Sequence, residues 1–193
     1  MKKLIISLFF LLFYTNSALA LVEIDITRGN LDPLPIAVSP LHVESGSEDI
    51  KQEGKIIKNV GEEISKVIEI NFKRSGLFNP LKKDSFVQSS DIVHVKPRFE
   101  DWRLIKAQAL VTGKVKVSNG KLRAEFRLWD VVAAKEMVAL AFSTTPENWR
   151  RVAHIISDKV YMRLTGESGY FDTRIIYVSE SGPKTQRIKK LAI

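Results

Sequence analysis

The residue types that most often carry chemistry are sparse in this 193-residue chain, and their spacing does not suggest a catalytic site. The three histidines, His42, His94 and His154, lie far apart, and none has a second His or Cys at metal-ligand spacing. Gly166-Glu167-Ser168-Gly169 is the nearest approach to a nucleophile elbow, but Tyr170 stands where the second glycine is needed. A helix is also expected before it, where the motif requires a strand. The sequence therefore predicts no catalytic residue, no metal ligand, no cofactor and no small-molecule substrate.

One pair of side chains could still exchange a proton. His154 and Asp158 are four residues apart on a predicted helix, a spacing that places side chains next to each other. Because no nucleophile is expected near them, an ordinary surface hydrogen bond between the two is favoured over a proton relay. Glu62 and Glu63 have lysine neighbours and are interpreted as part of a solvated helix face.

The first 20 residues have the pattern of an export signal. Lys2 and Lys3 precede an apolar run from Leu4 to Tyr14, and the stretch ends in Ala18-Leu19-Ala20. The apolar run is too short for a membrane anchor, which needs about 20 residues. The chain contains no cysteine, which excludes a disulfide framework and a lipid-modified exit. We expect cleavage after Ala20 and export to the periplasm.

The net charge of +8 and the pI near 9.6 raise the question of nucleic-acid binding. Between Leu21 and Gly169, however, basic and acidic residues are nearly balanced, and the excess lies in the signal segment and in the C-terminal tail. Nucleic-acid-binding domains concentrate Lys and Arg on one face. A mixed solvated surface is therefore favoured, without a nucleic-acid partner.

Two long amphipathic helices are expected. Apolar residues recur at three- and four-residue steps in both segments. They are Ile56, Ile57, Val60, Ile64, Val67, Ile68 and Phe72 in the first helix, and Trp149, Val152, Ala153, Ile156, Val160 and Leu164 in the second. The predicted helices run from Ile56 to Ser75, ending at Gly76, and from Pro146 to Thr165, with Thr145 as N-cap and Gly166 as the stop. Gly61 inside the first helix indicates close approach to a sheet.

The remaining segments predict strands and loops. Residues 22–26 and 34–38 are expected to form strands, and prolines limit the second to a few residues or to a sheet edge. Residues 44–51 are interpreted as a polar loop, Leu77, Phe78 and Leu81 as an apolar plug after the first helix, residues 84–97 as a loop with a short turn, and residues 100–107 as a short helix.

An antiparallel meander follows. The strands 109–117, 122–128 and 136–144 are joined by a hairpin turn at Asn119-Gly120 and a second turn at Ala133-Ala134. A further hairpin is expected from Arg174 to the end of the chain. The predicted fold class is therefore α/β in the α+β sense, with a mixed, largely antiparallel sheet and two main helices on one face.

Six stretches resemble one known family, the TolB proteins of the Tol-Pal system, in family order and at about family spacing. They are residues 74–81 (Arg-Ser-Gly-Leu-Phe-Asn-Pro-Leu), 109–115, 126–130, 153–160, 164–166 and 173–178. The resemblance covers most of the chain from Leu21 to Val178, but only the N-terminal domain and the first propeller strand of the family. It implies a signal peptide at 1–20, an N-terminal α/β domain at 21–168, and the remnant of the first blade of a β-propeller at 169–193.

The resemblance also implies a function. TolB proteins are non-enzymatic periplasmic interaction proteins that link inner-membrane TolA with outer-membrane Pal, in envelope integrity and in outer-membrane constriction during cell division. This chain is expected to keep the TolA-facing part, and Pal binding is expected only in a chain with the full propeller. A periplasmic enzyme or ligand-binding domain of similar layout is the alternative.

The residues expected to bind the partner form the N-terminus after cleavage. They are Leu21, Val22, Glu23, Ile24, Asp25 and Ile26. From Val22 onward, apolar side chains alternate with acidic ones. Such a strand can add to the edge of a partner's sheet, although the residues alone favour a strand that completes the protein's own sheet. The family resemblance favours the partner, since in TolB the mature N-terminus engages TolA.

Overall fold

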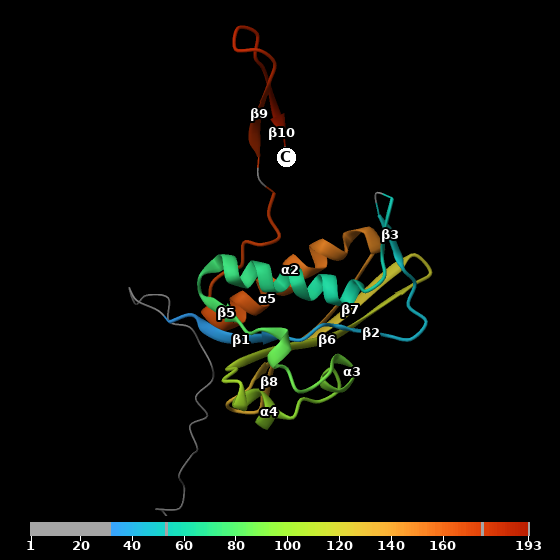
Figure 1. Cartoon of the computed structure of the whole chain (residues 1–193), viewed down its shortest axis with the longest axis vertical. Helices are drawn as coiled ribbons and strands as arrows, with labels where there is room; N and C mark the ends of the chain where they lie inside the picture. Colours follow the sequence, from blue (N-terminus) through green and yellow to red (C-terminus); the bar gives the residue numbers. More distant parts are fainter. Residues whose placement is uncertain (1–31, 53, 175, 193) are drawn as a thin grey trace, which may run out of the picture.

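The computed structural model describes residues 32–52, 54–174 and 176–192. In Figure 1, two long helices, α2 (Val60–Ser75) and α5 (Trp149–Thr165), lie together on one side of a sheet, and two short helices lie on its other side. A two-stranded ribbon projects from the body at the C-terminal end. The fold class is the predicted one, a mixed, mostly antiparallel sheet with helices.

The main sheet has the strand order β5-β1-β6-β7-β8. Its strands are β1 (Leu34–Val38), β5 (Phe78–Pro80), β6 (Ala109–Ser118), β7 (Lys121–Asp130) and β8 (Lys135–Thr144). β1 pairs in parallel with both β5 and β6, while the β6–β7–β8 meander is antiparallel. β2 (His42–Val43) also pairs in parallel with β6.

The meander confirms the sequence prediction. Ser118 and Lys121 face each other across the β6–β7 turn, and Asn119 and Gly120 have φ angles of 51° and 67°. These positive φ values are those that a two-residue hairpin turn requires at both central positions. Ala134, in the next turn, also has a positive φ of 53°.

The first helix begins later than predicted. Ile56 and Ile57 belong to β4 (Lys55–Ile57), which pairs with β3 (Ile50–Gln52) in a separate small hairpin, so residues 44–51 are not only a polar loop. The helix begins after Asn59, whose side chain accepts a hydrogen bond from the Glu62 backbone N–H and so satisfies one of the free donors of the first turn.

Two further details differ from expectation. β1 is short, as predicted, but it lies inside the sheet, where the Pro35 carbonyl accepts a hydrogen bond from Gln108 N. Phe78, expected in an apolar plug, lies in edge strand β5, and its ring is buried against Phe72 with a centroid distance of 4.9 Å. The chain after α2 therefore extends the sheet.

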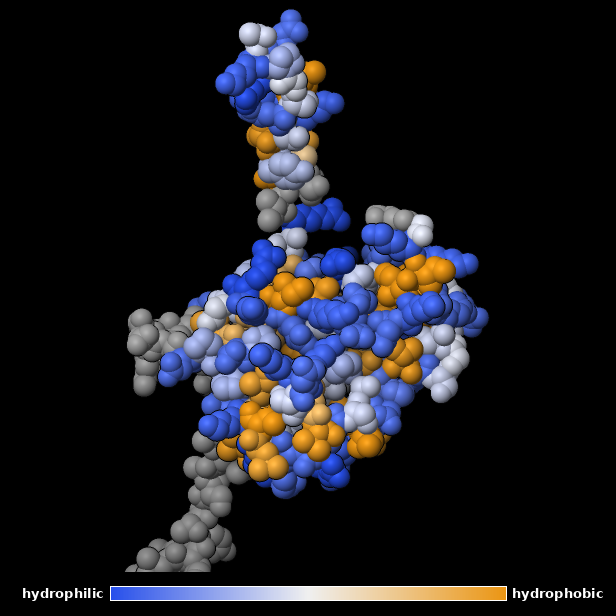
Figure 2. Space-filling view, in the orientation of Figure 1, coloured by the Kyte–Doolittle hydropathy of each residue, from blue (hydrophilic) through white to orange (hydrophobic). Residues whose placement is uncertain are grey.

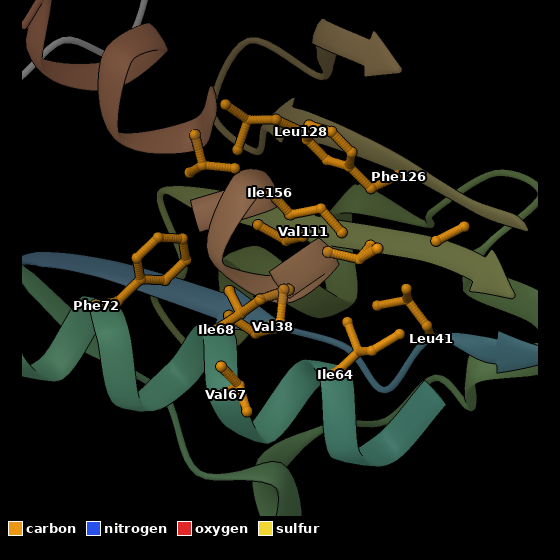
Figure 3. Packing of buried hydrophobic residues seen from close by; sticks show 14 of the residues in the cluster. Val38, Leu41, Ile64, Val67, Ile68, Phe72, Val111, Phe126, Leu128 and Ile156 are labelled. Carbon is orange, nitrogen blue, oxygen red and sulfur yellow. The ribbon is translucent and has the colours of Figure 1, made fainter. Parts of the chain in front are cut away.

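The main core lies between the sheet and the two long helices (Figure 3). Ile64, Ile68 and Phe72 of α2 meet Ile156 of α5 over the sheet, and all four side chains are fully buried. Gly61 confirms its predicted role, because a Cβ at this position would lie 2.0 Å from the Leu41 carbonyl oxygen. Burial of each large apolar side chain contributes about 1.5–3 kcal/mol, so this layer dominates the stability of the domain.

A second, smaller core lies on the opposite face of the sheet. It contains Trp102 and Leu110, is covered by α3 (Ser90–Val93) and α4 (Phe99–Leu104), and includes Ala37, Val93, Ala107 and Val131. Residues 84–97 contain the short elements η1 (Lys83–Ser85) and α3, which agrees with the predicted loop and turn. The helix expected at residues 100–107 is confirmed as the shorter α4.

The C-terminal ribbon consists of β9 (Tyr177–Ser181) and β10 (Ile188–Ala192). Within the described ranges, the two strands pair with each other and with no further strand. All five residues of β9 are exposed, and Figure 2 shows orange hydrophobic residues on the projecting ribbon.

Candidate functional site

The predicted partner-binding segment, Leu21–Ile26, lies outside the described residues, as do Ala18 and Ala20 at the predicted cleavage point. The structure describes instead the surfaces that the domain offers to other groups. One of these surfaces is the seam where α2 and α5 meet the chain that leaves the domain.

Three side chains connect the two helices at this seam. Asn71 of α2 is buried, and its amide nitrogen donates to Ser157 Oγ at 2.9 Å and lies 3.0 Å from His154 Nδ1. Ser157 Oγ donates its own hydrogen to the Ala153 carbonyl, so it can only accept from Asn71. His154 must therefore accept at Nδ1 and carry its hydrogen on Nε2.

This arrangement holds the imidazole neutral. Burial lowers the pKa of His154 below its usual value of 6.5, and the nearby charge of Arg150 acts in the same direction. Protonation would put a hydrogen on His154 Nδ1. This nitrogen would then face the N–H of the Asn71 amide and could no longer accept its hydrogen bond. Protonation of His154 would therefore weaken this contact between the two helices.

His154 does not form the predicted bond with Asp158. The Asp158 carboxylate accepts hydrogen bonds from Phe171 N at 2.7 Å and from Asp172 N at 3.1 Å, both on the chain after α5. The two unpaired backbone donors outcompete a histidine that is already held by Asn71. Gly169 is required beside this carboxylate, since a Cβ there would lie 2.3 Å from Asp158 Oδ1.

Aromatic rings hold the same exit segment. Tyr161 of α5 contacts Tyr170 and Phe171 in edge-on geometry, with centroid distances of 5.5 and 5.8 Å. Arg151 also pairs with Asp172 at 3.2 Å. The residues around Gly166-Glu167-Ser168-Gly169 are therefore a helix terminus and a clamped exit, with Gly166 in the left-handed conformation at φ 77°.

A hollow of about 370 Å³ opens beside this clamp. Its lining consists of Asn71, Arg74, His154, Tyr170, Phe171 and Thr173. The lining mixes polar and aromatic side chains, and among the described residues the His154 ring is hydrogen-bonded to Asn71 and to no hydroxyl that it could activate as a nucleophile.

The other two histidines come together, which the sequence did not predict. His42 of β2 and His94 after α3 stack with ring centroids 4.4 Å apart and an angle of 5° between the ring planes. His94 Nδ1 lies 2.9 Å from the Ser90 carbonyl, to which it donates. No group of three or more His, Cys, Asp or Glu side chains that could hold a metal ion occurs among the described residues.

The basic residues on the open face of the meander are neutralised locally. Lys114 pairs with Glu44 at 2.6 Å, and Arg127 pairs with Glu136 at 3.1 Å. The Lys114 ammonium lowers the pKa of the Glu44 carboxyl through this hydrogen bond. The predicted lysine neighbours of Glu62 are also confirmed, because Lys83 and Lys66 lie 3.2 and 3.5 Å from it. In the described part of the chain, no helix is long and apolar enough to cross a membrane.

Sequence reasoning missed Asn71 and Ser157, although a signal was available. Both are polar residues at positions that the helical period assigns to the buried face. A buried polar side chain requires a partner, so two of them on facing helices could have been matched.

The fold defines the class of protein: an α+β domain whose sheet carries two long helices on one face and two short helices on the other. The family model of the TolB amino-terminal domain matches residues 22–137. The chain belongs to this family.

Two comparisons agree with this assignment. The Tol-Pal system protein TolB of Pelagibacter ubique (strain HTCC1062) is 66% identical over 91% of this chain and 40% of its own length. The chain therefore spans about 40% of the curated relative. The crystal structure of TolB from Acinetobacter baumannii superimposes with a TM-score of 0.61 at 22% identity, over 82% of this chain and 35% of that one.

Proposed function

We propose that this chain is a non-enzymatic interaction protein of the periplasm, which acts in the Tol-Pal system by presenting residues 21–26 to TolA. The observation that carries the proposal is the 66% identity to a protein named for that system. The family match begins at residue 22, so it includes all but the first residue of this segment. The longer relatives of this chain would link TolA with Pal, and so act in envelope integrity and in constriction of the outer membrane during division.

The proposal includes a division of the chain into three parts. Residues 1–20 would be removed on export, residues 21–168 would form the TolA-facing domain, and residues 169–193 would begin the β-propeller. The clamp at Asp158 supports a fixed path for the chain as it leaves the domain. Mass spectrometry of the secreted chain tests the cleavage, because the expected mature protein begins at Leu21.

Titration against the periplasmic domain of TolA tests the partner. The chain without residues 1–20 is expected to bind, and Ile24→Pro is expected to weaken binding at least tenfold, since proline removes a backbone donor from a pairing strand. Ser90→Pro is the matched control, because Ser90 is the first residue of α3, where proline is tolerated. Thermal unfolding of both variants checks the fold.

Two results would contradict the proposal. TolA affinity could remain unchanged in a folded Ile24→Pro variant, which would make the segment merely structural. Tight binding of Pal by this chain would also contradict it, since the family's Pal surface is expected on a complete propeller.

A further inference from the structure

Strand β8 ends the main sheet with an edge that is open along its length. It pairs with β7 on one side and with no described strand on the other. Its ten residues carry charges only at Lys135 and Glu136, and its irregularity lies at the same end, so Val138 to Thr144 form a regular uncharged edge. Natural proteins usually protect such edges with proline, lysine or a short strand.

The opposite edge of the same sheet has this protection. β5 is only three residues long and ends in Pro80, which cannot donate to a neighbouring strand. Among the described strands, β5 therefore has this protection at its edge and β8 does not.

An apolar groove runs beside the β8 edge, on the side of α5. Its volume is about 370 Å³, and it is lined by Val138, Leu140, Lys159, Met162, Arg163 and Gly166. Leu140 and Met162 are 41% and 53% exposed, although both are large apolar side chains. The groove and the edge together offer backbone pairing and a pocket for alternate side chains of one added strand.

The positive charges beside the groove favour an acidic partner. Lys159 and Arg163 form no ion pair with the carboxylates of the described residues, unlike the paired cations on the open face of the meander. An incoming strand with Asp or Glu would neutralise them. A second copy of this chain that paired β8 with β8 would instead bring like charges together.

The continuation of this chain begins on the other flank of α5. Tyr170, Phe171 and Thr173 line the hollow with Asn71 and Arg74 of α2, which is the side of α5 away from β8. The exit clamp therefore directs the chain away from the groove.

We infer that the β8 edge and its groove bind an extended segment of another protein, in which an apolar residue and an Asp or Glu lie two positions apart and so share one face of the added strand. The segment adds as a strand to β8, places an apolar side chain over Leu140 and Met162, and directs carboxylates to Lys159 and Arg163. This surface is distinct from residues 21–26, which are proposed to donate a strand, whereas β8 receives one.

The test uses the whole mature chain and a synthetic peptide in which Val and Glu take turns at every second position, with Ser between them, so that both face the groove. The same peptide with Lys in place of Glu serves as the charge control. Fluorescence anisotropy is expected to show at least tenfold tighter binding of the acidic peptide at low salt, with a smaller preference at high salt. Hydrogen exchange in the complex is expected to slow at every second amide of β8, a pattern that an added strand produces and a side-chain contact alone does not.

Two variants at exposed positions separate the groove from the rest of the strand. Leu140→Glu is expected to reduce acidic-peptide binding at least tenfold, because it places a like charge in the apolar pocket. Ser143→Glu adds the same charge on the opposite face, across from Arg123 of β7, and is expected to leave binding unchanged. Circular dichroism and thermal unfolding check both folds.

The inference fails if the two peptides bind equally, or if folded Leu140→Glu binds as well as wild type. It also fails if ultracentrifugation shows a dimer that Leu140→Glu dissociates, since the occupant would then be a second copy. The outward-facing amides of β8 could also exchange slowly in the free chain and become fast in the Ile24→Pro variant. That result would assign the groove to the chain's own N-terminal segment and overturn the inference.

Discussion

Helix α5 and the β9–β10 ribbon both carry apolar side chains at regular intervals, but the two regions differ in what covers those side chains. Val152, Ile156 and Val160 of α5 are buried against α2 and the sheet. In the ribbon, Val178 and Ile188 remain 56% and 57% exposed. A two-stranded ribbon has one partner strand and no layer behind it, so its pattern is formed without being buried. A regular pattern of apolar side chains therefore has different energetic weight in the two regions.

The largest expected difference comes from removing one apolar side chain in each region. Phe72→Ala should lower the free energy of unfolding by about 3–5 kcal/mol, because the ring is fully buried in the main core. Ile188→Ala in the ribbon should change it by less than about 0.5 kcal/mol. Urea unfolding measures both. Equal losses would show that the ribbon is part of the cooperative domain.

A smaller loss is expected where the helix touches the backbone of the sheet layer. In Gly61→Ala the new methyl group would meet the Leu41 carbonyl oxygen at 2.0 Å, and a backbone atom cannot rotate away. Overpacking of this kind costs about 1–3 kcal/mol, which exceeds the gain of about 0.5–1 kcal/mol in helix propensity. Urea unfolding should therefore show net destabilisation, and a stabilised variant would mean that α2 shifts freely.

The boundary between the two regions is set by Asp158. Asp158→Asn keeps the shape of the side chain but removes its charge and one of its two carboxylate acceptors. Amide exchange at Phe171 and Asp172 should accelerate by about tenfold, which corresponds to about 1.4 kcal/mol of lost local stability. Amides in the middle of α5 serve as the internal control and should keep their rates. Acceleration along the whole helix would show that the clamp also stabilises α5.

The smallest effect is expected from pH. The pKa of His154 is lowered in the folded state, so below its ordinary value of 6.5 the unfolded chain binds a proton that the folded chain rejects. The stability that depends on neutral His154 is fully present above 6.5 and is lost as the pH falls toward the lower folded pKa.

The control for this prediction is His154→Gln, which stays neutral throughout. Unfolding free energies measured from about pH 7.5 to about pH 5 should fall more steeply for wild type than for the variant, since the two proteins differ in this one ionisable group. Parallel curves would show that the Asn71–His154 contact contributes nothing to folding.

The sequence alone determined the elements whose causes are local. The helical periods, the Gly76 and Gly166 stops and the Asn119-Gly120 turn each depend on neighbouring residues, and the structure confirms them. The same local patterns predicted the mixed sheet with its two main helices on one face. They also carried the resemblance to the TolB family.

Only the tertiary structure decided which residues meet across the chain. It moved Ile56 and Ile57 from a helix to a strand, because the hairpin with residues 50–52 and the Asn59 cap outweighed a continuous apolar period. It paired the Asp158 carboxylate with a backbone N–H of the exit segment, 13 positions away in the sequence. It also paired His154 with the Asn71 amide, 83 positions away. Such pairings depend on how whole layers pack, and no spacing within one segment encodes them. The open β8 edge is of the same kind, since a strand becomes an edge only when the order of the sheet is fixed.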